Sequence, residues 1–164
     1  IPYEIVKLTS ITDEQVMDAD VIEEVLLRFL AFCEGAVLVA HNATFDIGFL
    51  NETLRKMGRP PISNPIIDTL PLARAILKPM KSYRLGAVSR AYRVNYDDEV
   101  AHRADYDAEV LGSVLNMMFH QLMSEGIYNI DMLNEYQDMN DMWMNYYMMM
   151  QNMMQGMMNQ RDLY

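Results

Sequence analysis

The sequence predicts an α/β domain. Short runs rich in valine and isoleucine at 37–40 and 66–68 are typical of buried strands, while the stretches between them carry apolar residues at helical spacing. Such alternation of strand and helix patterns is typical of a parallel sheet covered by helices. The 164 residues are 51% apolar and 22% charged, which suits one globular domain. We therefore expect the two strands to pair in parallel, with a helix from Asp105 to Met123 packed against them.

The region before the first strand is predicted to be mostly helical. Residues 1–11 give no closed element of their own, so a connector is expected there. Thr12, followed by acidic residues, indicates the start of a helix, and an apolar stripe then runs from Val21 to Gly35. Charged residues within 18–20 are expected to divide this region into two helices.

Polar residues crowd the point where the first strand gives way to a helix. His41, Asn42, Thr44 and Asp46 follow the strand directly, and the carboxyl ends of strands are where open α/β sheets usually bind ligands. A purely structural alternative remains open at this stage. Asn42 or Thr44 could cap the helix while Asp46 meets the positive end of its dipole.

A second polar group opens the longest helical pattern. His102 lies just before this helix, and Asp107, five residues later, lies in its first turn. A histidine and two distant aspartates, Asp46 and Asp107, can together build a carboxylate-held metal site with a general base. The alternative for His102 is an ordinary surface histidine on a loop.

Both segments resemble motifs of one enzyme family. The string His-Asn-Ala-Thr-Phe-Asp-Ile-Gly-Phe-Leu at 41–50 resembles the second motif of the DEDDh 3′ to 5′ exonucleases, proofreading enzymes related to the epsilon subunit of bacterial DNA polymerase III. His102-Arg103-Ala104 with Asp107 resembles the third motif. Segments 64–70 and 133–136 are most similar to the exonuclease domain of PolC-type DNA polymerase III alpha subunits. The resemblance runs from about Leu8 to about Tyr136.

This resemblance implies a ribonuclease H-like exonuclease fold that lacks its first strands. Residues 1–128 would form the exonuclease-like domain, and 129–164 a helical tail rich in Met, Asn and Gln. The family's first motif, Asp-x-Glu on a strand, would lie ahead of Ile1. Without those strands, one edge and one face of the sheet would be exposed, which invites association. A thioether copper site in the tail is a less favoured alternative.

The resemblance also implies a site and a mechanism. Two Mg²⁺ or Mn²⁺ ions would drive hydrolysis of the terminal phosphodiester. Asp46 and Asp107 would be metal-binding carboxylates, and His102 would take a proton from the attacking water. Asp68, at the end of the second strand, is expected to be structural. The residues expected to contact the terminal nucleotide are Asn42, Thr44 and Phe45.

The expected function is therefore that of a 3′ to 5′ exonuclease (proofreading) domain of a bacterial replicative DNA polymerase III. Two of the family's four metal-binding carboxylates belong to the Asp-x-Glu motif, so we expect impaired activity in this chain. The alternative function is a catalytically inactive exonuclease-like module that serves a structural or interaction role. The partners implied are a single-stranded DNA 3′ end and a replicative polymerase in the same or a partner chain.

Charge and composition limit other functions. A net charge of -10 argues against a broad basic surface for nucleic acid, although an enzyme acting on a chain end remains compatible with it. The single cysteine, Cys33, is expected to be a buried hydrophobe. No signal peptide or membrane-length apolar run is apparent, so we expect a cytoplasmic location without membrane contact. The cluster of basic residues that could face phosphate, or could form a solvated helical face, is Arg74, Lys78, Lys81, Arg84, Arg90 and Arg93.

Overall fold

The computed structural model describes residues 1–77, 79–129, 131–136, 138–139, 142 and 149. Most of the predicted tail at 129–164 lies outside these residues. Along the chain, the elements are α1 (Tyr3–Thr9), α2 (Asp13–Val16), α3 (Ile22–Phe32), β1 (Leu38–Ala40), α4 (Ala43–Lys56), β2 (Ile66–Asp68), α5 (Thr69–Ile76), α6 (Leu85–Ala91) and α7 (Ala104–Ser124).

The two strands form the predicted parallel pair. Leu38 lies opposite Ile66 and Ala40 lies opposite Asp68, so both strands end at the same level. Ile67 of β2 belongs to the same buried cluster as Val110 of α7, along with other apolar residues of that helix. The predicted helix from Asp105 to Met123 is observed as α7, and its packing against the sheet is confirmed.

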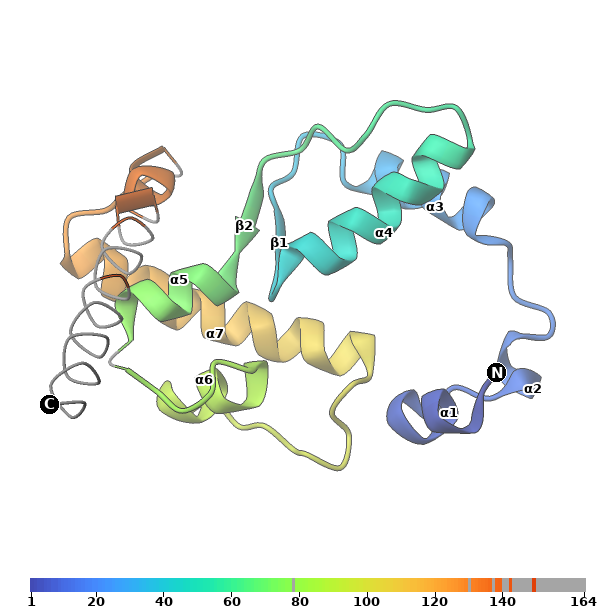
Figure 1. Ribbon diagram of the computed structural model, residues 1–164, viewed down its shortest axis with the longest axis horizontal. Coiled ribbons are helices and arrows are strands. Elements are labelled where there is room, and N and C mark those ends of the chain that lie inside the picture. The colour runs from blue at the N-terminus through green and yellow to red at the C-terminus, as the bar shows by residue number, and fades with distance from the viewer. Residues whose placement is uncertain (78, 130, 137, 140–141, 143–148, 150–164) are drawn as a thin grey trace, which may run out of the picture.

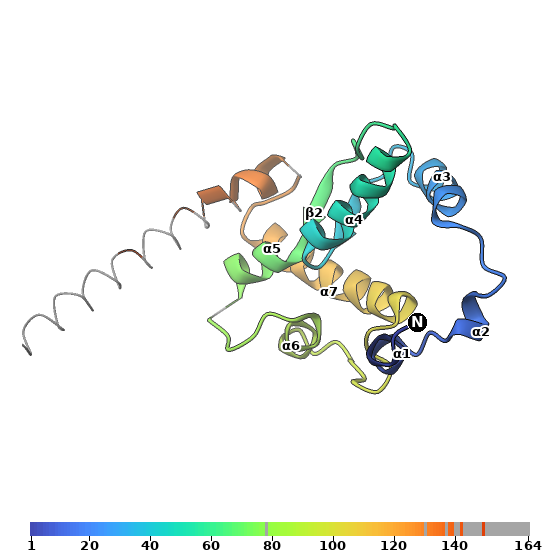
Figure 2. The same cartoon turned by 45° about the vertical axis from the view of Figure 1, so that its right-hand side comes forward.

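Helices lie on both sides of the strands. Figures 1 and 2 show α3 and α4 grouped on one side, and α5, α6 and α7 grouped on the other. Leu26 of α3 and Leu54 of α4 are almost completely buried, whereas the main cluster joins β2 to α5, α6 and α7. This arrangement places the start of α4 and the start of α5 beside the carboxyl ends of the strands.

The segment before α2 differs from the prediction. Residues 1–11 were expected to be a connector, but Tyr3–Thr9 form α1. Pro2 precedes its first turn, where a missing N–H costs nothing, and Ile5 and Leu8 repeat at a helical interval of three. Ser10 ends the helix in the left-handed conformation, with φ of 59°, and its N–H bonds to the Val6 carbonyl. α1 buries no residue and lies apart from the strands (Figure 1). A helix without a buried face has no marked pattern of apolar residues, so the sequence did not predict α1.

The predicted division of the next region is confirmed, because α2 ends at Val16 and α3 begins at Ile22. The N–H of Thr12 donates to Gln15 Oε1 at 2.8 Å in a capping box at the start of α2. Cys33 is a free, buried cysteine at the end of α3, as expected.

An apolar groove of about 400 Å³ lies beside β1. Val37 and Val39 line one side of it, and Leu115, Phe119 and Met123 of the neighbouring part of α7 line another. Within the described chain, β1 is paired along one edge alone. No helix in the described ranges combines the length and the apolar character needed to cross a membrane.

The chain just beyond α7 also packs on the core. Residues 131–136 are helical, and Leu133 is 3% exposed within the main cluster. The Tyr136 hydroxyl donates to Glu125 Oε2 at 3.2 Å, which joins this turn to the end of α7.

Candidate active site

One carboxylate organises the crossover from β1 to α4. Because β1 and β2 end in register, Asp68 lies beside the residues that follow Ala40. Asp68 Oδ1 accepts hydrogen bonds from the backbone N–H groups of Asn42 and Leu70, and Oδ2 accepts one from Ala43, each at 2.9 Å. The side chain therefore caps the first turns of both α4 and α5. This contact supports the structural role expected for Asp68.

Asn42 adopts an unusual backbone conformation at this crossover. Its φ of 75° and ψ of 54° place it in the left-handed region, which asparagine tolerates better than most residues. Its side chain makes no capping hydrogen bond to α4. The Asp68 carboxylate instead accepts hydrogen bonds from the N–H groups of Asn42 and Ala43. The Thr44 hydroxyl donates to Asn42 Oδ1 at 3.3 Å. Both side chains are exposed, so they remain available to a ligand.

Asp46 lies in the first turn of α4 and is exposed, next to Phe45, which is 73% exposed. Partial desolvation raises the pKa of the Asp46 carboxyl, and the negative charge of Asp68 raises it further. These effects outweigh the hydrogen bond from its own backbone N–H, which lowers the pKa. A cation bound here would relieve the repulsion between the two carboxylates.

His41 is held from both sides, a feature that the sequence did not reveal. Its Nε2 lies 2.7 Å from the Tyr83 carbonyl oxygen and its Nδ1 lies 2.9 Å from Thr69 Oγ1. Since a carbonyl oxygen only accepts, Nε2 carries the proton. Burial lowers the pKa of His41, although the Tyr83 carbonyl and the charge of Asp68 oppose this shift. Both ring nitrogens of this half-buried imidazole are thus occupied by hydrogen bonds.

The second polar group lies at the start of α7. His102 is exposed and has a φ of 70°, a strained conformation for a residue other than glycine. Asp107 lies in the first turn of α7, and its Oδ1 is buried without a hydrogen-bond partner. A buried polar atom left unpaired costs free energy. This carboxylate oxygen therefore suits coordination of a cation, which would compensate that cost.

An aromatic group packs beside Asp107. The rings of Tyr96 and Tyr106 lie 5.9 Å apart, and the Tyr106 hydroxyl accepts a hydrogen bond from the Asp97 N–H at 2.6 Å. Burial and then the charge of Asp107 raise the pKa of the Tyr96 hydroxyl. Tyr96 also approaches Gly86 so closely that a Cβ there would lie 2.6 Å from the ring. Sequence patterns gave no sign of this long-range packing.

The predicted site residues thus form two groups. Asn42, Thr44, Phe45 and Asp46 lie at the crossover from β1 to α4, beside His41 and Asp68, while His102 lies just before α7 and Asp107 lies in its first turn. In the described part of the chain, no three His, Cys, Asp or Glu side chains gather closely enough to hold a metal together. Convergence of Asp46 and Asp107 on one ion remains a prediction.

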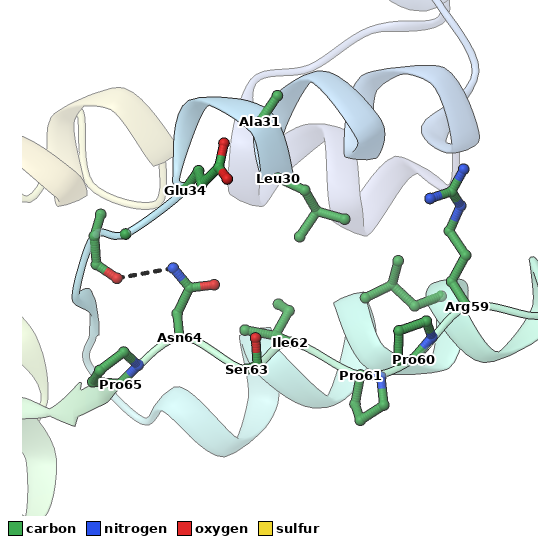
Figure 3. Close-up of a pocket in the computed structure, with 13 residues that line it drawn as sticks. Leu30, Ala31, Glu34, Arg59, Pro60, Pro61, Ile62, Ser63, Asn64 and Pro65 are labelled. Atoms are coloured by element: carbon green, nitrogen blue, oxygen red, sulfur yellow. Dashed lines mark hydrogen bonds between the residues drawn. The ribbon is translucent and has the colours of Figure 1, made fainter.

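A separate open pocket of about 540 Å³ lies between the end of α3 and the segment before β2. Figure 3 shows Leu30 and Ile62 near its centre, with Arg59 and Glu34 toward opposite ends. None of the predicted site residues lines this pocket.

Comparison with known proteins places the chain in a family. A family model described as "Exonuclease" matches residues 1–115. The chain therefore belongs to this exonuclease family. The family implies a ribonuclease H-like α/β fold, and the mostly helical architecture with its small parallel sheet is compatible with it.

The similarity extends to a particular kind of polymerase. DNA polymerase III PolC-type from Ureaplasma parvum serovar 3 is 46% identical over 132 residues, covering 79% of this chain and 9% of the relative. The proteins of the same description from Lactococcus lactis and Clostridium perfringens are 41% and 39% identical, covering 71% and 82% of this chain but 7% and 9% of the relatives. The chain is thus a PolC-like exonuclease domain that spans less than a tenth of these relatives' length.

Proposed function

We propose that this chain is the 3′ to 5′ proofreading part of a bacterial, cytoplasmic DNA polymerase III, acting on single-stranded 3′ ends of DNA. The observation that carries the proposal is the buried, unpartnered Oδ1 of Asp107. It belongs to the carboxylate that the resemblance to the third exonuclease motif assigns to a metal. Asp46, whose pKa is raised by partial burial and then by the charge of Asp68, supplies the second carboxylate.

The proposed roles follow from the chemistry of each side chain. Mg²⁺ or Mn²⁺, when bound, would supply a nucleophile at neutral pH and neutralise charge on the reacting phosphate. Asp46 and Asp107 would hold the metal with oxygen ligands. His102, exposed at the turn before α7, accepts a proton from the attacking water.

The surface around Asp46 suits a terminal nucleotide. Asn42 and Thr44 present exposed polar groups that can hydrogen-bond to sugar or base. The Phe45 ring, 73% exposed, can stack on a base, and such stacking contributes about 1–3 kcal/mol per base. These three residues would orient the 3′ end beside Asp46.

The proposed two-metal site needs more carboxylates than Asp46 and Asp107 supply. Two carboxylates, from Asp46 and Asp107, are too few to hold two divalent ions that repel each other. An Asp-x-Glu strand placed ahead of Ile1 would add the remaining two carboxylates. The alternative function, a catalytically inactive module, differs from this proposal in the activity expected of a longer chain that includes such a strand.

The test is Mn²⁺-dependent shortening of a single-stranded oligonucleotide labelled at its 5′ end, so that successive products report the direction of digestion. A longer chain that begins with an Asp-x-Glu strand should shorten the DNA stepwise from the 3′ end. Asp107→Asn in that longer chain should reduce the rate by about a hundredfold to a thousandfold. Asp105→Asn, which changes an exposed carboxylate in the same helical turn, is the matched control.

Three other outcomes would change the account. Equal activity from the short and the longer chain would contradict the incomplete-site argument. Digestion from the 5′ end would overturn the proposed direction. An inert longer chain that binds Mn²⁺ poorly would favour the inactive module.

A further inference from the structure

We propose that His41 is a positioning residue, whose imidazole ties the basic segment 79–84 to the turn that presents Asn42 and Asp46. The geometric part of this inference stands on hydrogen bonds alone. Its consequence for DNA rests on the proposed function.

The tie begins at Tyr83. His41 Nε2 donates to the Tyr83 carbonyl oxygen at 2.7 Å, across 42 residues of chain. Tyr83 also packs against the main core cluster, and its hydroxyl accepts a hydrogen bond from the Met80 N–H at 3.2 Å. Tyr83 therefore holds its own segment in place and, through its carbonyl, fixes the position of His41, which directly precedes Asn42.

The other side of the ring is fixed by a fully buried hydroxyl. Thr69, 0% exposed at the start of α5, has its Oγ1 2.9 Å from His41 Nδ1 and 3.3 Å from the Ala40 carbonyl oxygen. A neutral ring with its proton on Nε2 requires Nδ1 to accept the single Thr69 hydroxyl hydrogen, so in that state the hydroxyl does not also donate to the Ala40 carbonyl. The ring is thus held in one tautomer between α5 and the segment 79–84.

These contacts leave His41 no free nitrogen for proton transfer. The charged groups that act on the ring are Asp68, which favours the protonated form, and Arg74, which opposes it. Burial has the largest effect and keeps the pKa of His41 below its usual value. His41 therefore fixes geometry, in contrast to the exposed His102, for which we propose the proton-accepting role.

The tie joins the crossover to a segment that carries two cations. Lys81 and Arg84 are exposed, and no ion pair of theirs occurs in the part of the chain that the structure describes. In a protein with a net charge of -10, a few positioned cations are the available source of attraction for phosphates. We infer that Lys81 and Arg84 contact phosphates of the strand that leads to the 3′ end held at Asn42.

The geometric test is amide hydrogen exchange of residues 79–84 in the full chain, with His41→Ala, His41→Gln and His120→Ala. Loss of one well-formed hydrogen bond should lower protection of this segment about three- to tenfold in His41→Ala. His41→Gln, which retains a donor near the Tyr83 carbonyl, should restore part of it. His120, an exposed histidine on α7, is the matched control and should change nothing. Unchanged protection in His41→Ala would overturn the tie.

Imidazole nitrogen NMR provides a second readout that does not depend on folding of a variant. In the unmodified chain, His41 should keep its proton on Nε2 and show a pKa below the ordinary value for histidine. A ring that titrates like an exposed histidine, or that carries its proton on Nδ1, would contradict the proposal.

The DNA arm measures binding of a fluorescent single strand against salt concentration, with Ca²⁺ present. Loss of two phosphate contacts in Lys81→Ala/Arg84→Ala should reduce the slope of log K against log salt by about 1 to 2. His41→Ala alone should also reduce this slope. Added to Lys81→Ala/Arg84→Ala, it should cause little further reduction. An additive effect would refute the coupling. If the unmodified chain binds no DNA, the proposed function fails, while exchange and NMR still decide the tie.

Discussion

The Asp68 carboxylate at the end of β2 accepts a hydrogen bond from the backbone N–H of Asn42, 26 residues earlier, at 2.9 Å. The neighbouring Ala43 N–H bonds to the second oxygen of the same carboxylate. This pair of contacts fixes the left-handed turn at Asn42 and hence the direction in which α4 presents Asp46. The position of one candidate metal ligand therefore depends on a side chain that lies on another strand.

Asp68→Asn should lower the free energy of unfolding by about 2 kcal/mol, because an amide offers one acceptor oxygen to three backbone donors. Urea unfolding at neutral pH measures this change. Asp105→Asn, which alters an exposed ion pair with Arg103, should leave the free energy nearly unchanged. Equal stability of the two variants would show that the Asp68 contacts contribute nothing.

Asp46→Asn should stabilise the chain at neutral pH in metal-free buffer. The pKa of Asp46 is higher in the folded state than in the unfolded state. At pH values between these two pKa values the folded protein binds more protons, so the free energy of unfolding falls as pH rises through this range. The gain should stay below about 1 kcal/mol because the group is largely exposed. It should vanish below the ordinary value of 3.8, where the carboxyl is protonated in both states. Urea unfolding from pH 3 to about pH 7 tests this, and a variant less stable at neutral pH would contradict it.

Gly86→Ala and Gly112→Ala should have opposite effects, although both glycines lie within helices. A Cβ at Gly86 would lie 2.6 Å from the Tyr96 ring, so that substitution should cost about 1–3 kcal/mol of unfolding free energy. Nothing lies within 4 Å of a Cβ at Gly112, and alanine there should stabilise α7 by about 0.5–1 kcal/mol. Thermal unfolding of both variants provides the comparison. A stabilising Gly86→Ala would show that Tyr96 does not pack there.

Leu133→Ala should destabilise the domain, because this side chain is 3% exposed within the main cluster. The expected loss is about 2–5 kcal/mol, measured by urea unfolding. Met132→Ala, at a neighbouring position that is 37% exposed, is the control. A negligible loss for Leu133→Ala would indicate that the domain ends before this turn.

The sequence allowed prediction of those features whose signals are local. Valine- and isoleucine-rich runs marked β1 and β2, and the long apolar stripe marked α7, because burial imposes a regular pattern on the residues involved. The break before α3 followed from charged residues within an apolar stripe. By contrast, α1 buries nothing, so hydrophobic patterning could not reveal it.

The residues of the candidate site stay a prediction from the sequence, and the contacts among them could not be predicted from it. Motif spacing pointed to Asp46, His102 and Asp107, since their chemistry and position stand in the sequence. The role of His41 depends on Tyr83, which lies 42 residues away, and no local pattern encodes that pairing. The close approach of Tyr96 to Gly86 is likewise a product of tertiary packing.

The central claim is that Asp46 and Asp107 serve one metal site, and electron paramagnetic resonance of free Mn²⁺ tests it directly. The chain should bind Mn²⁺, and Asp46→Asn and Asp107→Asn should each weaken the same binding event, with little further loss in the double variant. Asp105→Asn should bind like the unmodified chain. Independent, additive losses from the two substitutions, or Mn²⁺ binding unaffected by both, would contradict a shared site.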